Sequence, residues 1–158
     1  KGERKVSIDI SFCIITDNSM EACKRIIHMI QAIRRLEIEN YEILVIGGKG
    51  NNFMGKNPDL TKIDFDESIK PGWITKKKND VAKIAKYDNL VMMHDYFIVH
   101  HHWYKGYLKI LDRFKDCDLC LNPVSLIDGR RDFTDWVTLD HPEFGMHRAL
   151  PYGDESNI

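Results

Sequence analysis

His94 and Asp95 directly follow the apolar run Leu90 to Met93. Such a run is typical of a parallel strand buried in a sheet, and open α/β sheets bind ligands in a crevice beyond the carboxyl ends of their strands. His94 and Asp95 therefore stand where such a fold does its chemistry, and a carboxylate in that place can hold a divalent cation through its oxygen atoms. The alternative is that Asp95 caps a helix, in which case its replacement by Ala should cost about 1 kcal/mol. If Asp95 holds a metal, the same replacement should leave stability unchanged or slightly higher.

Lys76, Lys77 and Lys78 open a predicted helix over residues 75–87. Cations are unfavourable at a helix N-terminus, which attracts anions, so a phosphate group near these lysines is one explanation for them. Asn79 follows these lysines. The alternative is a basic face exposed to solvent. On the first interpretation, changing Lys76 and Lys77 to Ala should weaken nucleotide binding and change stability by about 0.5 kcal/mol or less.

Three further groups have less specific patterns. The segment Gly47 to Gly50 follows an apolar strand but matches neither Walker A nor GxGxxG, so we expect either a flexible loop or a loop that faces a nucleotide. His100 to His102 invite a metal interpretation, but consecutive residues should point in different directions. The four cysteines are predicted to be buried, reduced thiols, because no second CxxC pair or histidine pair completes a zinc site.

The composition predicts one soluble domain of ordinary size. The chain has 158 residues, of which 43% are hydrophobic and 30% are charged, enough for one sizeable core. A net charge of -1 does not indicate the basic surface that binds nucleic acid. No apolar run approaches the length of a membrane span. We therefore expect a cytoplasmic domain without a membrane span or a nucleic-acid partner. We expect both ends, at Lys1 and Ile158, to be cuts in a longer protein.

Apolar periodicity places the candidate residues on an α/β framework. Continuous apolar runs predict strands, helical spacing predicts helices between them, and Asp17, Asn18 and Ser19 are residues that stop a strand and cap a helix. The predicted strands of one mostly parallel sheet are Ser11 to Thr16, Ile43 to Ile46, Leu90 to His94 and Leu119 to Leu121, with an edge strand at Lys62 to Asp66. The predicted helices, on both faces of the sheet, are Ser19 to Leu36, Thr75 to Tyr87 and Trp103 to Phe114.

The ordered set of motifs resembles the nucleotide-diphospho-sugar transferase (GT-A) fold of family-2-like glycosyltransferases, over most of Ser7 to Asn122. Phe12 to Asn18 looks like the first strand of that family with its nucleotide-contacting end, and Tyr41 to Gly48 looks like the second strand. Lys76 to Asn79 resembles the basic helix that precedes the family's acidic motif. Leu90 to Tyr96 takes the place of the strand that carries the acidic DxD motif.

The resemblance implies a glycosyltransferase that binds a nucleotide-diphosphate sugar, with a UDP-sugar as the leading candidate, and transfers the sugar to a glycosyl acceptor. The charge of the departing diphosphate must be neutralised by a divalent cation, by basic side chains or by both. Asp95 is the implied ligand of Mn²⁺ or Mg²⁺, and His94 is implied either as a second ligand or as a contact of the ribose. The implied contacts of the nucleotide sugar are Thr16, Asp17, Asn18, Gly47, Gly48, Lys76, Lys77, Lys78, Asn79, His94 and Asp95.

Three departures from the family pattern leave other functions open. Gly47 and Gly48 stand where an aspartate often recognises the base, and the DxD-like motif at residues 94–96 has one carboxylate, Asp95. The catalytic base stays unassigned, because in this fold class it lies after the acceptor region. The later candidates are His141, Glu143 and His147. The alternatives are a nucleotidyltransferase on a related fold and a noncatalytic binding module.

Overall fold

The computed structural model describes residues 7–50, 58–114 and 119. The chain divides into two units, residues 1–115 and 116–158, and all the helices and strands given below lie in the first unit. The predictions outside the described residues concern the strand at residues 119–121, of which only Leu119 is described, the CxxC pair of Cys117 and Cys120, and the late candidates His141, Glu143 and His147.

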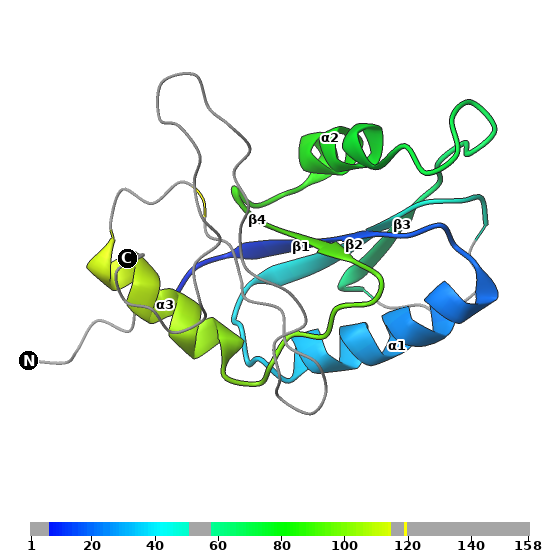
Figure 1. Ribbon diagram of the computed structural model, residues 1–158. Helices are drawn as coiled ribbons and strands as arrows, with labels where there is room; N and C mark the ends of the chain where they lie inside the picture. Colours follow the sequence, from blue (N-terminus) through cyan, green and yellow to red (C-terminus); the bar gives the residue numbers. More distant parts are fainter. Residues whose placement is uncertain (1–6, 51–57, 115–118, 120–158) are drawn as a thin grey trace, which may run out of the picture. The chain divides into compact units, whose positions relative to one another are not determined.

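The sheet of the first unit has four parallel strands in the order β3-β2-β1-β4 (Figure 1). The strands are β1 Ile10–Ile15, β2 Tyr41–Ile46, β3 Leu60–Ile63 and β4 Asn89–His94. The register aligns Ile15 with Ile46 on one side and with His94 on the other, so β1, β2 and β4 end level with one another. After β3 the chain crosses back over β1 to form β4. This reversal makes the carboxyl ends of β1 and β4 the topological switch point, where such sheets bind ligands.

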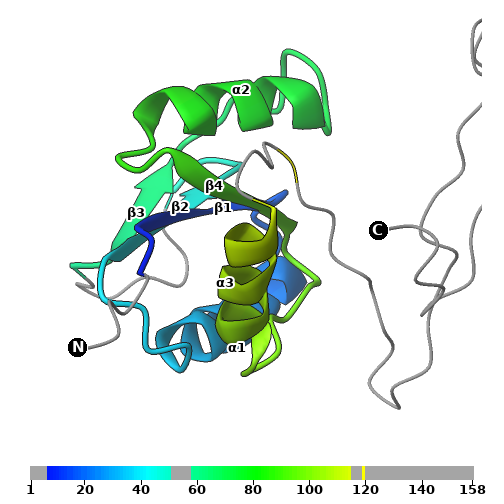
Figure 2. The same cartoon turned by 90° about the vertical axis from the view of Figure 1, so that its left-hand side faces the viewer.

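Helices cover both faces of the sheet, as the sequence predicts (Figures 1 and 2). The helices are α1 Met20–Arg34, α2 Ile74–Ile84 and α3 Trp103–Arg113. On one face, α1 and α3 pack around Phe12 and Ile14. On the opposite face, α2 places Val81 against Cys13 and Ile15. The apolar residues of β1 alternate between the two hydrophobic clusters, so both faces of this strand are covered and all of its residues are buried.

The elements agree with the predicted ones in type and order, and differ at their ends. Ser19 caps α1 as predicted, because its hydroxyl accepts a hydrogen bond from the Ala22 N–H at 3.2 Å. The helix α2 ends at Ile84 rather than at Tyr87, and the edge strand β3 begins earlier than predicted, at Leu60. Within residues 7–50 and 58–114, none of the helices has both the length and the apolar character needed to cross a membrane.

The prediction that β4 is buried on both faces is wrong. Met93 is 6% exposed, but Leu90 and Met92 are each 37% exposed. The physical reason is the strand order: in the described part of the chain, β4 is an edge strand that pairs with β1 alone. An apolar run in sequence therefore marked a strand that is half-buried, with its inner face in the core formed by α1 and α3.

Arg34, the last residue of α1, forms a two-point ion pair with Asp59, which precedes β3. Its Nε and Nη2 atoms donate to the two carboxylate oxygens at 2.9 and 2.7 Å, and the hydroxyl of Tyr41 donates to the same group at 3.1 Å. The hydrogen bond from Arg34 lowers the pKa of Asp59 below its ordinary value of 3.8, although burial opposes this change. The pair lies at the amino-terminal edge of the parallel sheet, opposite the strand ends.

We expect the Arg34–Asp59 pair to stabilise the fold at neutral pH and to lose this effect in acid. Because the pKa of Asp59 is depressed in the folded state, its contribution is present above the ordinary value of 3.8 and is lost as pH falls through the folded-state pKa. Asp59→Asn should therefore cost about 0.5 kcal/mol at neutral pH, a value typical of partly exposed pairs, and less at about pH 3. Urea unfolding of both proteins across this range measures the difference, and a cost that does not change with pH would contradict the expectation.

Candidate functional site

Polar residues at the ends of β1 and β4 meet at the carboxyl edge of the sheet. The strand-end site is defined here as Thr16, Asp17, Asn18, His94 and Asp95. The Thr16 hydroxyl donates a hydrogen bond to Oδ2 of Asp95 at 2.7 Å, and the Asp95 N–H donates to the Ile15 carbonyl at 3.2 Å. Thr16 and Asp95 are buried, with exposed fractions of 3% and 7%. The structure thus joins two of the predicted site residues directly, at the topological switch point.

Arg25, which the sequence analysis missed, reaches this site from α1. Its Nη2 donates to Oδ1 of Asp95 at 3.1 Å, and its Nε donates to the Asp95 main-chain carbonyl at 3.1 Å. The side chain of Arg25 is 45% exposed, while that of Asp95 is 10% exposed. One carboxylate oxygen of Asp95 therefore accepts from Thr16 and the other from Arg25. The sequence signal that could have identified Arg25 was its position near the start of α1, since the first turns of a helix that follows a parallel strand lie at the ligand-binding edge of the sheet.

The interpretation of Asp95 as a helix cap is wrong. Residues 95 and 96 form a turn, and the next helix, α3, begins at Trp103 with His102 as its N-cap residue. Asp95 instead connects the end of β4 to β1 and to α1. Its carboxylate is held by side chains far away in sequence, which no local pattern indicates.

The loop after β1 is stabilised by its own polar side chains. The Thr16 hydroxyl accepts from the Asn18 N–H at 3.0 Å, and the Asp17 carboxylate accepts from the Ser19 N–H at 2.8 Å. Asn18 has φ 62, a left-handed conformation that asparagine tolerates better than most residues. The hydrogen bond from the Ser19 N–H lowers the pKa of Asp17, with a smaller contribution from the charge of Arg25, while burial opposes both. Asp17 is therefore an exposed, ionised carboxylate beside two buried residues that shape the loop.

Gly47 and Gly48 pack against this loop so closely that a side chain has no room. A Cβ atom on Gly47, which has φ 145, would lie 1.8 Å from the Thr16 carbonyl oxygen. A Cβ atom on Gly48, which has φ 54, would lie 2.5 Å from the Cβ of Asn18. The Gly47 N–H donates to a β3 carbonyl at 3.3 Å, and Nζ of Lys62 donates to the Gly47 carbonyl at 2.6 Å. The main-chain groups of Gly47 are thus bound inside the protein, and close packing explains why no aspartate stands at this position.

Lys77 is buried, so the expectation that its side chain is exposed is wrong. Its exposed fraction is 2%, its Nζ donates to the Thr16 carbonyl at 2.8 Å, and it forms an ion pair with Glu67. Nζ also lies 5.2 Å from the ring centre of Phe65, a cation–π arrangement. The reason for the burial is helical spacing: Lys77 stands one turn before Val81, on the face of α2 that packs on the sheet.

The partner of Lys77 is an ionised carboxylate. Burial raises the pKa of Glu67, but the hydrogen bonds from Lys77 and from the Gly72 N–H outweigh it and hold the pKa below its ordinary value. Lys76 likewise pairs with Asp80 at 2.6 Å, one turn further along α2. The anions near the basic first turn of this helix are therefore carboxylates of the protein itself. That accounts for two of its lysines without a bound phosphate.

The positive charge of Lys78, on α2, acts on His94 at the end of β4. Burial lowers the pKa of His94, and the charge of Lys78 lowers it further, while Asp95 opposes these effects. The neutral imidazole form of His94 is therefore favoured. Its ring stacks on that of Tyr96, with centroids 5.4 Å apart and an interplanar angle of 8°, and Tyr96 is 60% exposed. A flat aromatic surface thus adjoins Asp95, of the kind that stacks on a base or a sugar ring.

Asp95 and His94 do not by themselves fit a resident Mn²⁺ or Mg²⁺ ion. Such ions need several oxygen ligands, and the carboxylate of Asp95 already accepts hydrogen bonds from Thr16 and from the cationic Arg25. Across residues 7–50 and 58–114, the group of three potential ligands that does converge is His100 to His102, which contains neither Asp95 nor His94.

The cysteines of the first unit agree with their prediction as buried, reduced thiols. Cys13 and Cys23 are both free and buried. Burial, with a smaller contribution from the charge of Glu42, raises the pKa of the Cys13 thiol to about 12. Burial likewise raises the pKa of Cys23, with the charge of Asp17 adding to it. Neither thiol is a nucleophile at neutral pH, because the reactive species is the thiolate.

No protein-family model matches this chain, and no curated protein matches it significantly. The function is therefore argued from the arrangement of the strand-end site.

Proposed function

We propose that this protein binds a nucleotide-diphosphate sugar at the strand-end site and transfers the sugar to an acceptor, as glycosyltransferases of the GT-A fold do. The observation that carries the proposal is the meeting of Thr16 and Asp95 at the switch point between β1 and β4. In an open parallel sheet this is the place where nucleotides bind. The motif order that resembles the family assigns nucleotide contact to the same two strand ends.

Arg25 and Lys78 are the basic groups that would neutralise the diphosphate. Arg25 uses two N–H donors on Asp95, has five in total, and keeps nearly half of its side chain in solvent. Planar guanidinium groups bind phosphate oxygens in pairs of hydrogen bonds, which are stronger than neutral ones. Asp95 holds the guanidinium group of Arg25 at the carboxyl edge of the sheet. In this arrangement Asp95 positions the cation that meets the phosphates, and a metal ion at Asp95 and His94 is not needed.

A noncatalytic nucleotide-binding module is the second candidate function. The internal bonds of Asp95 favour it, because a carboxylate engaged by Thr16 and Arg25 is a positioning group rather than a ligand for a metal cofactor. The nucleotidyltransferase alternative gains no such support. The segment from Thr16 to Ser19 forms a turn and a helix cap that are held by hydrogen bonds between its own side chains and nearby backbone N–H groups, and it is not a glycine-rich phosphate loop.

Calorimetric titration of UDP-, GDP- and CDP-sugars, each in EDTA and again in Mn²⁺, tests the proposed binding. We expect one of these classes to bind, with UDP-sugars as the leading candidate. We expect this binding in EDTA as well as in Mn²⁺. Arg25→Ala should weaken binding at least tenfold, because a charge-assisted hydrogen bond contributes about 1.5–3 kcal/mol and 1.4 kcal/mol corresponds to a factor of about ten.

Arg34→Ala is the matched control, since Arg34 lies on the same helix and pairs with an aspartate at the opposite edge of the sheet. It should leave the affinity unchanged. Arg25→Lys keeps a cation near Asp95 but removes the planar fork, and we expect an intermediate affinity. Failure of all three nucleotide-sugar classes to bind, or an equal loss in the Arg34 variant, would refute the proposal. Hydrolysis or transfer of the bound sugar separates the enzyme from the noncatalytic module.

A further inference from the structure

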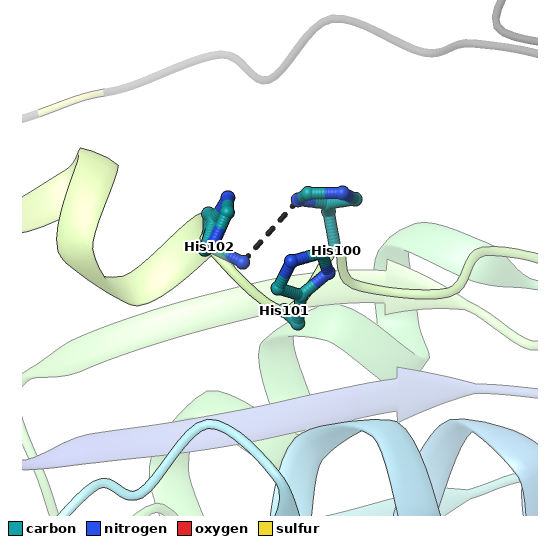
Figure 3. Close-up of side chains that lie close together, drawn as sticks. All are labelled: His100, His101 and His102. Carbon is teal, nitrogen blue, oxygen red and sulfur yellow. Dashed lines mark hydrogen bonds between the residues drawn. The ribbon is translucent and has the colours of Figure 1, made fainter.

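We propose that His100, His101 and His102 form a binding site for a divalent transition-metal ion, with Zn²⁺ as the leading candidate. The sequence predicts that consecutive histidines point apart, and the structure shows that prediction to be wrong. One ring nitrogen from each histidine lies within 4.8 Å of the others, and neighbouring ring centroids are 4.0 and 3.9 Å apart. Figure 3 shows the three side chains gathered on the turn that leads into α3.

The geometry follows from the turn that the three residues form. The N–H of Trp103 donates to the carbonyl of His100 at 2.8 Å, which closes the turn just before the helix. The N–H of His102 donates to Nδ1 of His100 at 3.2 Å, as drawn in Figure 3, and brings the first ring back over the third residue. A compact turn thus gathers side chains that an extended strand would send to alternate faces.

Imidazole nitrogen is a preferred ligand of Zn²⁺, Ni²⁺ and Cu²⁺, and three imidazoles with a fourth position open are an established zinc arrangement. Tetrahedral coordination at about 2.0–2.1 Å requires the nitrogens to approach one another to roughly 3.3 Å. All three histidines are exposed, so their rings can make this movement without disturbing the core.

Three effects oppose metal binding here, and they are small by comparison with the formation of three metal–nitrogen bonds. Coordination through either nitrogen of His100 gives up its exposed hydrogen bond with His102, a loss of about 1 kcal/mol. The N-terminus of α3 disfavours a cation by about 0.3–1 kcal/mol, and Lys105 adds a further positive charge nearby. Hard ions such as Mg²⁺ gain little from imidazole and should not bind here.

Zinc titration of the full chain by calorimetry and equilibrium dialysis, in a buffer free of phosphate, tests this site. The triple variant His100→Ala, His101→Ala, His102→Ala should bind one Zn²⁺ fewer than the wild type. Each single replacement should weaken the site at least tenfold, since even outer partners of metal ligands contribute about 10–100-fold. A large excess of Mg²⁺ should leave Zn²⁺ binding unchanged.

His28→Ala is the matched control, because His28 is an exposed histidine on α1. It should retain the zinc site in full. Thermal midpoints in EDTA should be the same for all variants, which separates loss of a ligand from loss of the fold. The proposal is overturned if the triple variant binds as much Zn²⁺ as the wild type, or if any single replacement changes the affinity less than about twofold, since the ion would then lack three imidazole ligands.

Discussion

Lys77→Met should lower the free energy of unfolding by about 3 kcal/mol, the low end of the range for a broken buried ion pair. The ammonium group of Lys77 donates to the Thr16 carbonyl at 2.8 Å and pairs with Glu67, whose side chain is 27% exposed. Its removal leaves a buried carbonyl without this donor and a carboxylate without its cation. Denaturant unfolding with an unchanged slope measures the loss directly.

Lys76→Met is the control for this prediction. It removes the same charge from the neighbouring position of α2, where the side chain is 45% exposed and pairs with Asp80 on the surface. Such a change should alter stability by about 0.5 kcal/mol or less. Combining Lys77→Met with Glu67→Gln should restore part of the loss, because the uncompensated carboxylate is removed. Equal effects of the two lysine variants would show that Lys77 is not the buried partner of Glu67.

Asp95→Ala should cost about 2 kcal/mol of stability and weaken nucleotide-sugar binding at least tenfold. Most of the stability loss comes from the buried Thr16 hydroxyl, which loses its acceptor at 2.7 Å. Loss of the ion pair with Arg25 contributes less to the loss of stability, because the Arg25 side chain is 45% exposed and its guanidinium can form hydrogen bonds with water instead. Binding falls because Arg25 is no longer held at the sheet edge, and a loss of 1.4 kcal/mol in binding free energy corresponds to about tenfold.

Asp59→Ala provides the comparison, since Asp59 also pairs with an arginine of α1 but lies at the opposite edge of the sheet. It should cost no more than about 1 kcal/mol and leave binding unchanged. The double variant Thr16→Val, Asp95→Ala should be less destabilised than the sum of its single variants, because each removes the same hydrogen bond. An Asp95→Ala protein with wild-type stability would show that the Thr16–Asp95 bond does not hold the two strand ends together.

The sequence by itself predicted the framework: parallel strands, their order along the chain, and helices on both faces. This was possible because the signals are local. The largely apolar run of β1 and the helical spacing of the apolar residues in α1 can be recognised from the sequence alone. The polar residues that stop β1 and β4 could also be recognised, and parallel pairing brings such ends to one edge of the sheet. Asp95 was therefore predicted as a site residue from its place at a strand end, whereas Thr16 was implied by the resemblance to the GT-A fold.

Tertiary structure decided what each of these residues does. Arg25 contacts Asp95 across 70 positions of sequence, and Lys77 reaches the Thr16 carbonyl across 61. Contacts of this kind depend on strand order and on which face of a helix meets the sheet. A run of three lysines looks uniform in sequence, yet helical geometry buries the middle one and leaves Lys76 in solvent. Periodicity predicts which segments become strands and helices, whereas burial and charge pairing follow from packing between segments that are distant in the chain.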